Sequence, residues 1–294
     1  MNARARWLGV LFGVAWAVVP AGSRADHAVW LGLGQHFYQA HSFGPVLAED
    51  DRFVFTALAI PDPAASIPMV AASIRMPDGL ERGLDNSDGG GVWQFERTYA
   101  SMVDLEQAHP EGLYTFRIWR APIVSCAIPL ERNGRSYPPA PRIDNLSAAQ
   151  SVPADSAFAV YWDAWEGATA ADRIQLSVKK EDGDVVFETP FPTELEALDG
   201  LATSVEIPAG SLGAGQRYTG ELLWLRFAGW ATGECAEVVA QEAYFSVNEF
   251  SLVTQGADSP FRPSLQRSLP ADGATGVPVR SEERRVGKEC RSRW

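Results

Sequence analysis

Apolar and polar positions between residues 53 and 250 follow a pattern that predicts strands rather than helices. Residues 92–99, 113–119 and 173–179 alternate between the two classes, which is the period of a strand with one buried face. Turns rich in glycine, proline and aspartate separate these short runs, as is typical of β-sandwiches. The remaining expected strands are 53–60, 70–76, 123–130, 157–162, 184–189, 202–207, 216–227 and 242–250.

One segment carries helix signals instead. Ser101 can cap a helix, Asp104 follows it by three residues, and Pro110 and Gly112 would stop the helix. We therefore expect a single short helix over residues 101–109.

A proline-rich segment divides the expected strands into two groups. Residues 132–141 read RNGRSYPPAP, and proline lacks the backbone N–H that regular structure requires. The sequence therefore predicts an N-terminal sandwich-like domain over 26–131, a linker over 132–141 and a second domain over 142–254. The second domain has about seven strands, the number of an immunoglobulin-like sandwich.

The N-terminus has the three parts of a secretory signal. Arg4 and Arg6 precede an uncharged apolar run over 7–19, and small residues follow Pro20. We expect a signal peptide over 1–25 that is cleaved near Ala25. An uncleaved anchor or a buried helix is the alternative, although the run is shorter than the roughly 20 residues of a membrane-spanning helix.

The C-terminal residues 280–294, RSEERRVGKECRSRW, differ from the rest of the chain in being basic. They resemble a widely used sequencing adapter translated in frame. That resemblance implies an artefactual tail and a natural protein that continues beyond Val279. A genuine anion-binding tail is the alternative.

The charge balance excludes one class of partner. The chain has 25 Lys and Arg against 37 Asp and Glu, and nine of the basic residues lie in the two ends described above. Such an acidic surface repels phosphate, so we expect no nucleic-acid partner.

Cysteine usage leaves one question open. Apart from Cys290 in the tail, the chain has Cys126 and Cys235, too few for a zinc site or a disulfide framework. An exported chain can still join them. The predicted strands place Cys126 near the end of the first domain and Cys235 in a loop that faces it, so a bridge between domains is one possibility and two buried thiols are the other.

Two motifs resemble those of fibronectin type III domains. Trp162 in AVYWD is similar to the buried tryptophan of the second strand, and residues 210–218, GSLGAGQRY, are similar to the stretch before the sixth strand. Residues 76–254 also resemble uncharacterised secreted proteins of environmental bacteria, and 268–279 resemble the first strand of a bacterial immunoglobulin-like domain. These resemblances imply an all-β fold of tandem fibronectin type III and immunoglobulin-like sandwiches, with a linker and the start of a truncated third domain over 255–279. They imply no activity, because a fold does not define a function.

Candidate chemistry is sparse. His36 and His41 lie near the acidic residues 49–51, but an incidental polar loop explains them better than a metal site. Residues 85–91, DNSDGGG, are oxygen-rich but lack the distal glutamate of an EF-hand, so calcium is left open beside a solvated loop. No nucleophile elbow, phosphate loop or Cys–His pairing occurs. We therefore expect no catalytic residues and no resident cofactor.

Exposed tryptophans are the remaining indication of binding. Trp165, Trp224 and Trp230 could stack on sugar rings if they form an exposed row, whereas packing in the cores is the competing explanation. The sequence thus favours a non-catalytic exported or cell-surface protein used for adhesion, structure or ligand display, with a surface protein or extracellular polysaccharide as partner. The alternatives are a carbohydrate-binding accessory region and a secreted hydrolase whose catalytic domain lies beyond residue 279.

Overall fold

The computed structural model describes residues 27–40, 44–48, 52–61, 68–86, 91–121, 124–134, 136–192, 194, 196–235 and 238–256. These residues belong to one compact unit of the chain. The predicted signal peptide, the predicted third domain from residue 257 onward and the basic tail lie outside the described residues.

The described chain is mostly β-structure with one α-helix. Its elements are β1 (His27–Gln39), β2 (Val46–Leu47), β3 (Phe53–Pro61), β4 (Met69–Arg75), β5 (Glu81–Gly83), β6 (Trp93–Tyr99), α1 (Met102–Ala108), β7 (Gly112–Arg120), β8 (Val124–Arg132), the 3-10 helix η3 (Ala148–Gln150), β9 (Phe158–Tyr161), β10 (Arg173–Lys180), β11 (Val185–Glu188), β12 (Leu198–Asp199), β13 (Ser204–Ile207), β14 (Arg217–Thr232) and β15 (Val238–Val253).

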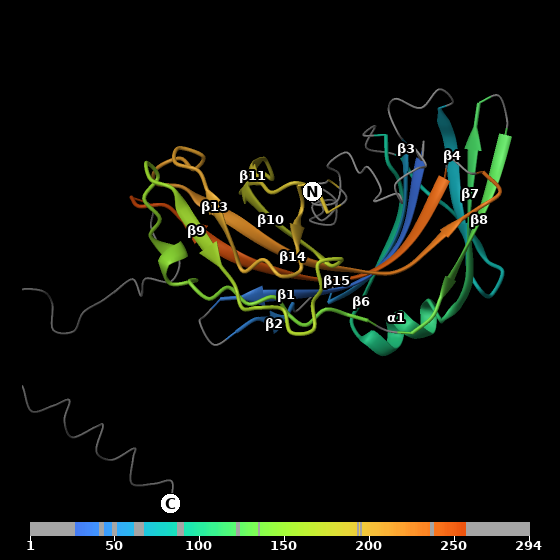
Figure 1. Cartoon of the computed structure of the whole chain (residues 1–294), viewed down its shortest axis with the longest axis horizontal. Helices are drawn as coiled ribbons and strands as arrows, with labels where there is room; N and C mark the ends of the chain where they lie inside the picture. Colours follow the sequence, from blue (N-terminus) through green and yellow to red (C-terminus); the bar gives the residue numbers. More distant parts are fainter. Residues whose placement is uncertain are drawn as a thin grey trace, which may run out of the picture. The chain divides into compact units, whose positions relative to one another are not determined.

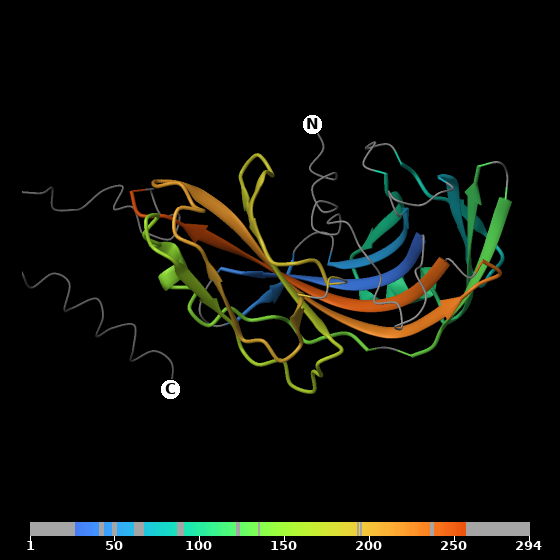
Figure 2. The ribbon, with the colours of Figure 1, turned by 45° about the horizontal axis from the view of Figure 1, so that its top comes forward.

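Three sheets make up this structure. The largest has the strand order β11-β10-β14-β15-β1-β3-β6, with β12 and β2 at its sides. A sheet of order β5-β4-β7-β8 covers one part of it, and the pair β13-β9 covers another. Figures 1 and 2 show the long strands β14 and β15 running from one of these layered regions into the other.

The C-terminal layered region is an immunoglobulin-like sandwich of the fibronectin type III kind. Strands β11, β10, β14 and β15 form one layer and β9 and β13 form the other, and this division matches the arrangement of such sandwiches. Buried side chains from both layers form its core, including Val160, Leu176 and Phe250.

Both fibronectin-like motifs take their expected places. Trp162 is buried beside β9, and its indole N–H donates a 2.8 Å hydrogen bond to the Ala202 carbonyl. Tyr218 begins β14 and its hydroxyl accepts a 2.7 Å hydrogen bond from the Gly213 N–H, while Leu212 is buried. This is the tyrosine corner that fixes the chain before the sixth strand of such domains.

The N-terminal layered region is closed by the four-stranded sheet. Its core joins Phe55 of β3 with Ile74 of β4, Phe116 of β7 and Ile128 of β8. The predicted helix is confirmed as α1, where the Ser101 hydroxyl accepts a 3.1 Å hydrogen bond from the Asp104 N–H. Ser101 is a favourable cap because it satisfies an N–H that lacks a partner within the helix.

The two sandwiches share strands rather than meeting as separate bodies. β15 contributes Val238, Ala240 and Tyr244 to the first core, and Phe250 and Leu252 to the second. The proline-rich segment lies against this strand, because Ser246 donates a 2.6 Å hydrogen bond to the Pro138 carbonyl. Residues 132–141 therefore connect two cores within one compact unit.

Strand β1 was not among the expected strands, although it lies inside the large sheet. It pairs in parallel with β15 and antiparallel with β3. Val29, Leu31 and Leu33 face the first core, whereas Ala28 and Trp30 belong to a third apolar cluster on the opposite face of the sheet. Because both faces are buried, the strand lacks the alternation that marks a half-exposed strand.

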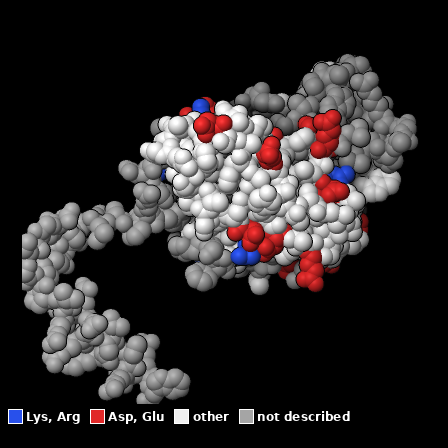
Figure 3. Space-filling model, turned by 60° about the vertical axis from the view of Figure 1, so that its left-hand side comes forward, with Lys and Arg blue, Asp and Glu red and all other residues white. Residues whose placement is uncertain are grey.

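Figure 3 shows one face of the molecule, on which acidic side chains are more frequent than basic ones and are scattered. This surface agrees with the acidic composition of the chain.

Candidate functional site: an apolar pocket at the bulge of strand β14

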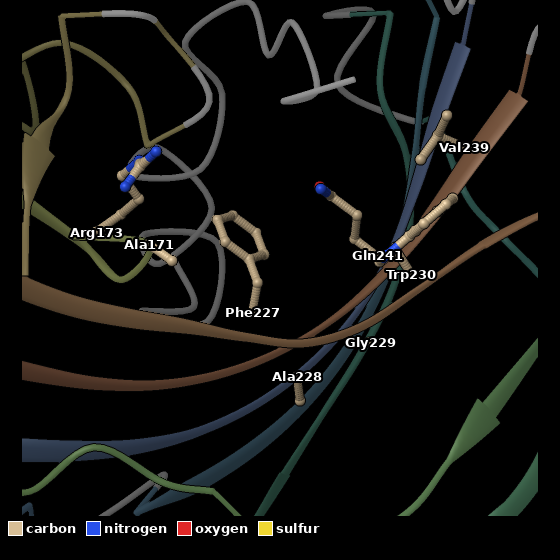
Figure 4. A pocket seen from close by; sticks show the side chains of 8 residues that line it. All are labelled: Ala171, Arg173, Phe227, Ala228, Gly229, Trp230, Val239 and Gln241. Atoms are coloured by element: carbon tan, nitrogen blue, oxygen red, sulfur yellow. The ribbon is translucent and has the colours of Figure 1, made fainter. Parts of the chain in front are cut away.

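A pocket of about 320 Å³ lies on the face of the large sheet that is turned away from both sandwich cores. Its described lining is mostly apolar, and it consists of Ala171, Arg173, Phe227, Ala228, Gly229, Trp230, Val239 and Gln241. Figure 4 shows Phe227 and Arg173 on one side of this space and Gln241 and Val239 on the other. The pocket is near the lower end of the volumes of small-molecule sites, about 300–1,000 Å³, so it has room for a ring-sized group.

A β-bulge creates the pocket. Phe227 and Trp230 are three residues apart, and in a regular strand they would face opposite sides of the sheet. The register shifts between Phe227 and Gly229, so that Phe227 pairs with Ala243 and Trp230 pairs with Gln241. The extra residue, Ala228, therefore brings both aromatic rings to the same face, which is how bulges re-aim side chains.

Trp230 is the most exposed aromatic residue of the pocket. Its side chain is 64% exposed, so it makes little contribution to the folded core. Tryptophan is enriched at binding interfaces, so an exposed indole ring beside an apolar pocket indicates a binding surface. Of the three tryptophans that the sequence indicated for binding, Trp230 is the one whose side chain is exposed to solvent.

Two residues of the lining carry buried polar atoms that have no partner among the described residues. Gln241 is 6% exposed, and its Oε1 accepts no hydrogen bond from the described part of the chain. Figure 4 shows its amide extending into the space beside Phe227. Arg173 donates from its Nη1 to the carbonyls of Ala170 and Asp172, whereas its Nε is buried and has no acceptor. Unpaired buried polar atoms are unfavourable, so each is a place where a ligand atom would be stabilised.

Trp30 of β1 packs against Phe227, which is one wall of the pocket. In the parallel pairing of β1 with β15, Trp30 is the register partner of Gln241. Its ring packs edge-on against Phe227 at 5.7 Å between centroids and lies 5.9 Å from Phe191. Phe227 is therefore held between the pocket and a buried aromatic cluster, which gives the pocket a fixed wall.

The three tryptophans do not form one exposed row, and packing in a core, the competing explanation, holds for Trp165 and Trp224. Trp165 and Trp224 are 5% and 2% exposed and stack on each other, with ring centroids 5.1 Å apart. The Arg226 guanidinium covers the outer side of Trp165 at 4.9 Å. Both indoles are buried in the second core, so Trp165, Trp224 and Trp230 do not form an exposed surface on which a sugar chain could stack.

Arg226 is held above Trp165 by Asp172. Its Nε and Nη2 donate hydrogen bonds of 2.8 and 3.1 Å to the two carboxylate oxygens. Burial alone would raise the pKa of Asp172, but hydrogen bonds from Arg226 and from the Thr169 backbone outweigh burial and hold the pKa below its usual value. This ion pair is a structural clamp on the loop before β10.

Cys126 and Cys235 are joined by a disulfide, with Cα atoms 5.8 Å apart. Cys126 lies on β8 of the first sandwich, and Cys235 lies in the turn between β14 and β15. The Glu234 N–H donates a 3.2 Å hydrogen bond to the Ala127 carbonyl at the same point. The tip of the β14–β15 hairpin, which packs against the first core, is thereby bonded to β8. The sequence had left the bond itself open, and it is present, but it lies at the first core rather than between two separate domains.

The ionisable groups with strongly shifted pKa values are buried in the cores. Burial and the nearby Arg132 charge lower the pKa of His109 to about 4, and its ring stacks on Phe55 with a centroid separation of 3.5 Å. Burial raises the pKa of Glu242, which accepts a 2.8 Å hydrogen bond from the Tyr244 hydroxyl. Neither His109 nor Glu242 lines the pocket.

A buried ion pair between Lys179 and Glu221 lies on the face of the large sheet that is turned away from the second core. Lys179 donates hydrogen bonds of 2.8 and 2.9 Å to both oxygens of Glu221, and burial raises the pKa of that carboxyl. The pair joins neighbouring strands β10 and β14. With each charge neutralised by the other, this arrangement is that of a structural ion pair.

Metal chemistry finds no support in the described part of the chain, where no group of three or more His, Cys, Asp and Glu side chains is placed to hold an ion. His41, residues 49–51 and residues 87–90 of the loop considered for calcium lie outside the described residues, so the choice between calcium and a solvated loop stays open there. Within the described ranges, no helix is long and apolar enough to cross a membrane.

Comparisons with known proteins add little to the geometry. No protein-family model and no curated protein matches the sequence. Among solved structures, the crystal structure of chicken CNTN1 FN1-FN3 domains is similar, with 10% identity, a TM-score of 0.26, and coverage of 80% of this chain and 69% of that chain. The strand order and the tyrosine corner, rather than this likeness, define the class: the described chain is an all-β protein with an immunoglobulin- and fibronectin type III-like sandwich fold.

Proposed function

We propose that this chain is a non-catalytic, exported protein that displays a binding surface outside the cell, in an adhesive or structural role. The observation that carries the proposal is the set of side chains that line the pocket. None of the described residues that line it is a carboxylate, histidine, serine or cysteine, so it offers no general acid, base or nucleophile. It offers apolar contact area and two unpaired polar atoms, which suit recognition rather than turnover.

The disulfide supports export. Disulfides form and persist in oxidising compartments outside the cytoplasm and are rare within it. Cys126 and Cys235 are 109 residues apart in the sequence, and the bond between them lies at the first core. Together with the signal-like N-terminus, this bridge favours a secreted or surface location.

The shared strands support a scaffolding role. A linker between separate domains allows relative motion, whereas β14 and β15 cross from one core into the other. The position of the pocket relative to both sandwiches is therefore fixed. A rigid support of this kind lowers the entropy lost on binding a partner.

The proposal is tested on the full chain produced with its own N-terminus in a bacterial host. We expect the protein in the medium or on the surface, where protease added to intact cells removes it. Beads coated with the purified protein should be retained by cells or by their extracellular material more than beads coated with an unrelated acidic protein. Cytoplasmic retention, or hydrolysis of ester, glycoside, peptide or phosphate substrates that follows the protein through purification, would contradict the proposal.

Carbohydrate binding is the second candidate function, and one observation still favours it. Trp230 presents an exposed indole face beside an amide, and both groups occur in sugar sites. Because Trp165 and Trp224 are buried, such binding would involve a single ring rather than a chain of sugars. Retention of the protein in affinity gels containing polysaccharide, lost in Trp230→Ala, would establish this alternative.

A further inference from the structure

We propose that the pocket at the bulge of β14 receives a single tyrosine side chain presented by a partner protein. This inference rests on the proposed function, because it names the partner chemistry of the same surface. It follows from the walls of the pocket, from its two unpaired polar atoms and from its size.

The walls select a flat apolar group. Phe227 and Trp230 bring two aromatic rings to the space, and Val239 and Ala171 add aliphatic surface. Aromatic rings pack on such walls through dispersion and edge-to-face contacts, and tyrosine and tryptophan are the most frequent anchors of protein interfaces. A sugar ring carries several hydroxyl groups, and the described part of the lining has too few polar partners for them.

The polar atoms select a hydroxyl on that group. Gln241 Oε1 is a buried acceptor and Arg173 Nε is a buried donor, and neither has a partner among the described residues. A phenol hydroxyl both donates and accepts, so it can pair with either atom. An indole can only donate, and a phenylalanine ring can do neither. Tyrosine therefore suits the pocket better than the other two aromatic side chains.

The geometry of the site also favours a side chain that belongs to a partner surface. A volume of about 320 Å³ is large enough for one aromatic ring, and the exposed Trp230 stands at the edge, where a partner surface would cover it. In interfaces, one anchor in a pocket is surrounded by contacts that exclude water. Trp230 would be the main contact of that rim.

The test uses the full chain with four small probes followed by ligand-observed NMR: N-acetyl-tyrosinamide, N-acetyl-phenylalaninamide, N-acetyl-leucinamide and cellobiose. We expect the tyrosine probe to bind weakly, with a dissociation constant on the order of 1 mM, since one ring makes few contacts. The phenylalanine probe should bind about three- to tenfold more weakly, because it leaves the buried polar atoms unpaired. The leucine probe and cellobiose should not bind.

Two variants and a control assign the binding to the pocket. Trp230→Ala should abolish binding of the tyrosine probe without changing the fold, because the side chain is exposed. Gln241→Leu removes the unpaired oxygen and should bring the affinities of the tyrosine and phenylalanine probes within about twofold of each other. Tyr161→Ala, which removes an aromatic side chain that is 49% exposed on β9, should bind as the wild type does.

Three results would overturn the proposal: no binding of the tyrosine probe at millimolar concentration, binding that Trp230→Ala leaves intact, or binding of cellobiose that depends on Trp230. These outcomes are distinct from failure of the proposed function. Beads that adhere equally well with the wild type and with Trp230→Ala would reject the pocket and leave the adhesive role in place.

Discussion

The ring of Phe245 on β15 lies over the backbone of Gly34, its register partner on β1, so closely that a Cβ added at Gly34 would overlap the ring. Gly34 has no positive φ, so the requirement is for space rather than for backbone freedom. The first and the last strands of the described chain are thus joined by a contact that depends on the absence of a side chain.

Gly34→Ala should therefore destabilise the protein. We expect a loss of about 1–3 kcal/mol in the free energy of unfolding, the usual range for overpacking a core. Urea titration of the variant and the wild type measures this difference. Gly83→Ala on β5 is the matched control, because no atom lies within 4 Å of the added Cβ, and it should change stability by less than about 0.5 kcal/mol. Equal effects at the two sites would contradict the packing described for β1.

Removing the Cys126–Cys235 disulfide should also weaken the fold. A bridge that closes about 100 residues is worth nearly 5 kcal/mol in the chain-entropy model, and measured values are commonly 2–4 kcal/mol. We expect the double variant Cys126→Ala with Cys235→Ala to lose about that amount in urea unfolding, and we expect reductant to have no further effect on it. Thiol titration of the denatured, unreduced full chain should find one of its three cysteines free, and three free thiols would show that the bridge is absent.

Arg132 should be costly to replace, because it is a buried charge that connects three parts of the first sandwich. Its Nη1 donates a 2.7 Å hydrogen bond to the carbonyl of His109 at the end of α1, and its Nε lies 3.9 Å from the Glu242 carboxylate on β15. Arg132→Met leaves Glu242 buried without a counter-charge, and the expected loss is about 3–5 kcal/mol in the free energy of unfolding.

Two further variants check the role of Arg132. Adding Glu242→Gln to Arg132→Met should recover part of the lost stability, since no unpaired charge is then buried. Arg117→Met breaks the half-exposed pair with Glu81 and should change stability by no more than about 1 kcal/mol. A loss at Arg117 as large as that at Arg132 would be inconsistent with this account.

His109 predicts a specific dependence of stability on pH. Its pKa is about 4 in the folded protein and near 6.5 in the unfolded chain, so the unfolded state binds more protons between these values. Its contribution is fully present above pH 6.5 and is lost as the pH falls toward 4, by about 3 kcal/mol in total. The measurement is the difference in unfolding free energy between wild type and His109→Gln at pH 7 and at pH 4.5. That difference should shrink at the lower pH, and a constant difference would show that His109 titrates normally.

The sequence was informative where apolar side chains lie on one face of a strand and polar side chains on the other. Strands such as β6 and β10 were found from alternation within one or two residues of their ends, and Ser101 with Pro110 located the helix. The residue patterns around Trp162 and Tyr218 also indicated the kind of sandwich. The indole N–H of Trp162 and the hydroxyl of Tyr218 each form a hydrogen bond with the backbone that another side chain would not form.

The remaining features depend on contacts between distant parts of the chain. β1 is buried on both faces, and therefore its sequence has no strand period. The expected strand over 216–227 stopped where β14 has its bulge, and so the pairing of Trp230 with Gln241 that forms the pocket was not foreseen. Burial of Trp165 and Trp224 is decided by Arg226 and by the second core, which an isolated stretch of sequence does not reveal.

Because β14 and β15 belong to both cores, the two sandwiches should unfold as one cooperative unit. Native-state hydrogen exchange with increasing urea tests it most directly, by comparing β7 in the first core with β10 in the second. We predict that both strands exchange with the same free energy and the same dependence on urea, and that Leu176→Ala in the second core lowers the protection of β7 by the same amount as that of β10. Protection of β7 that is unchanged by Leu176→Ala, with separate opening free energies for the two strands, would contradict the claim.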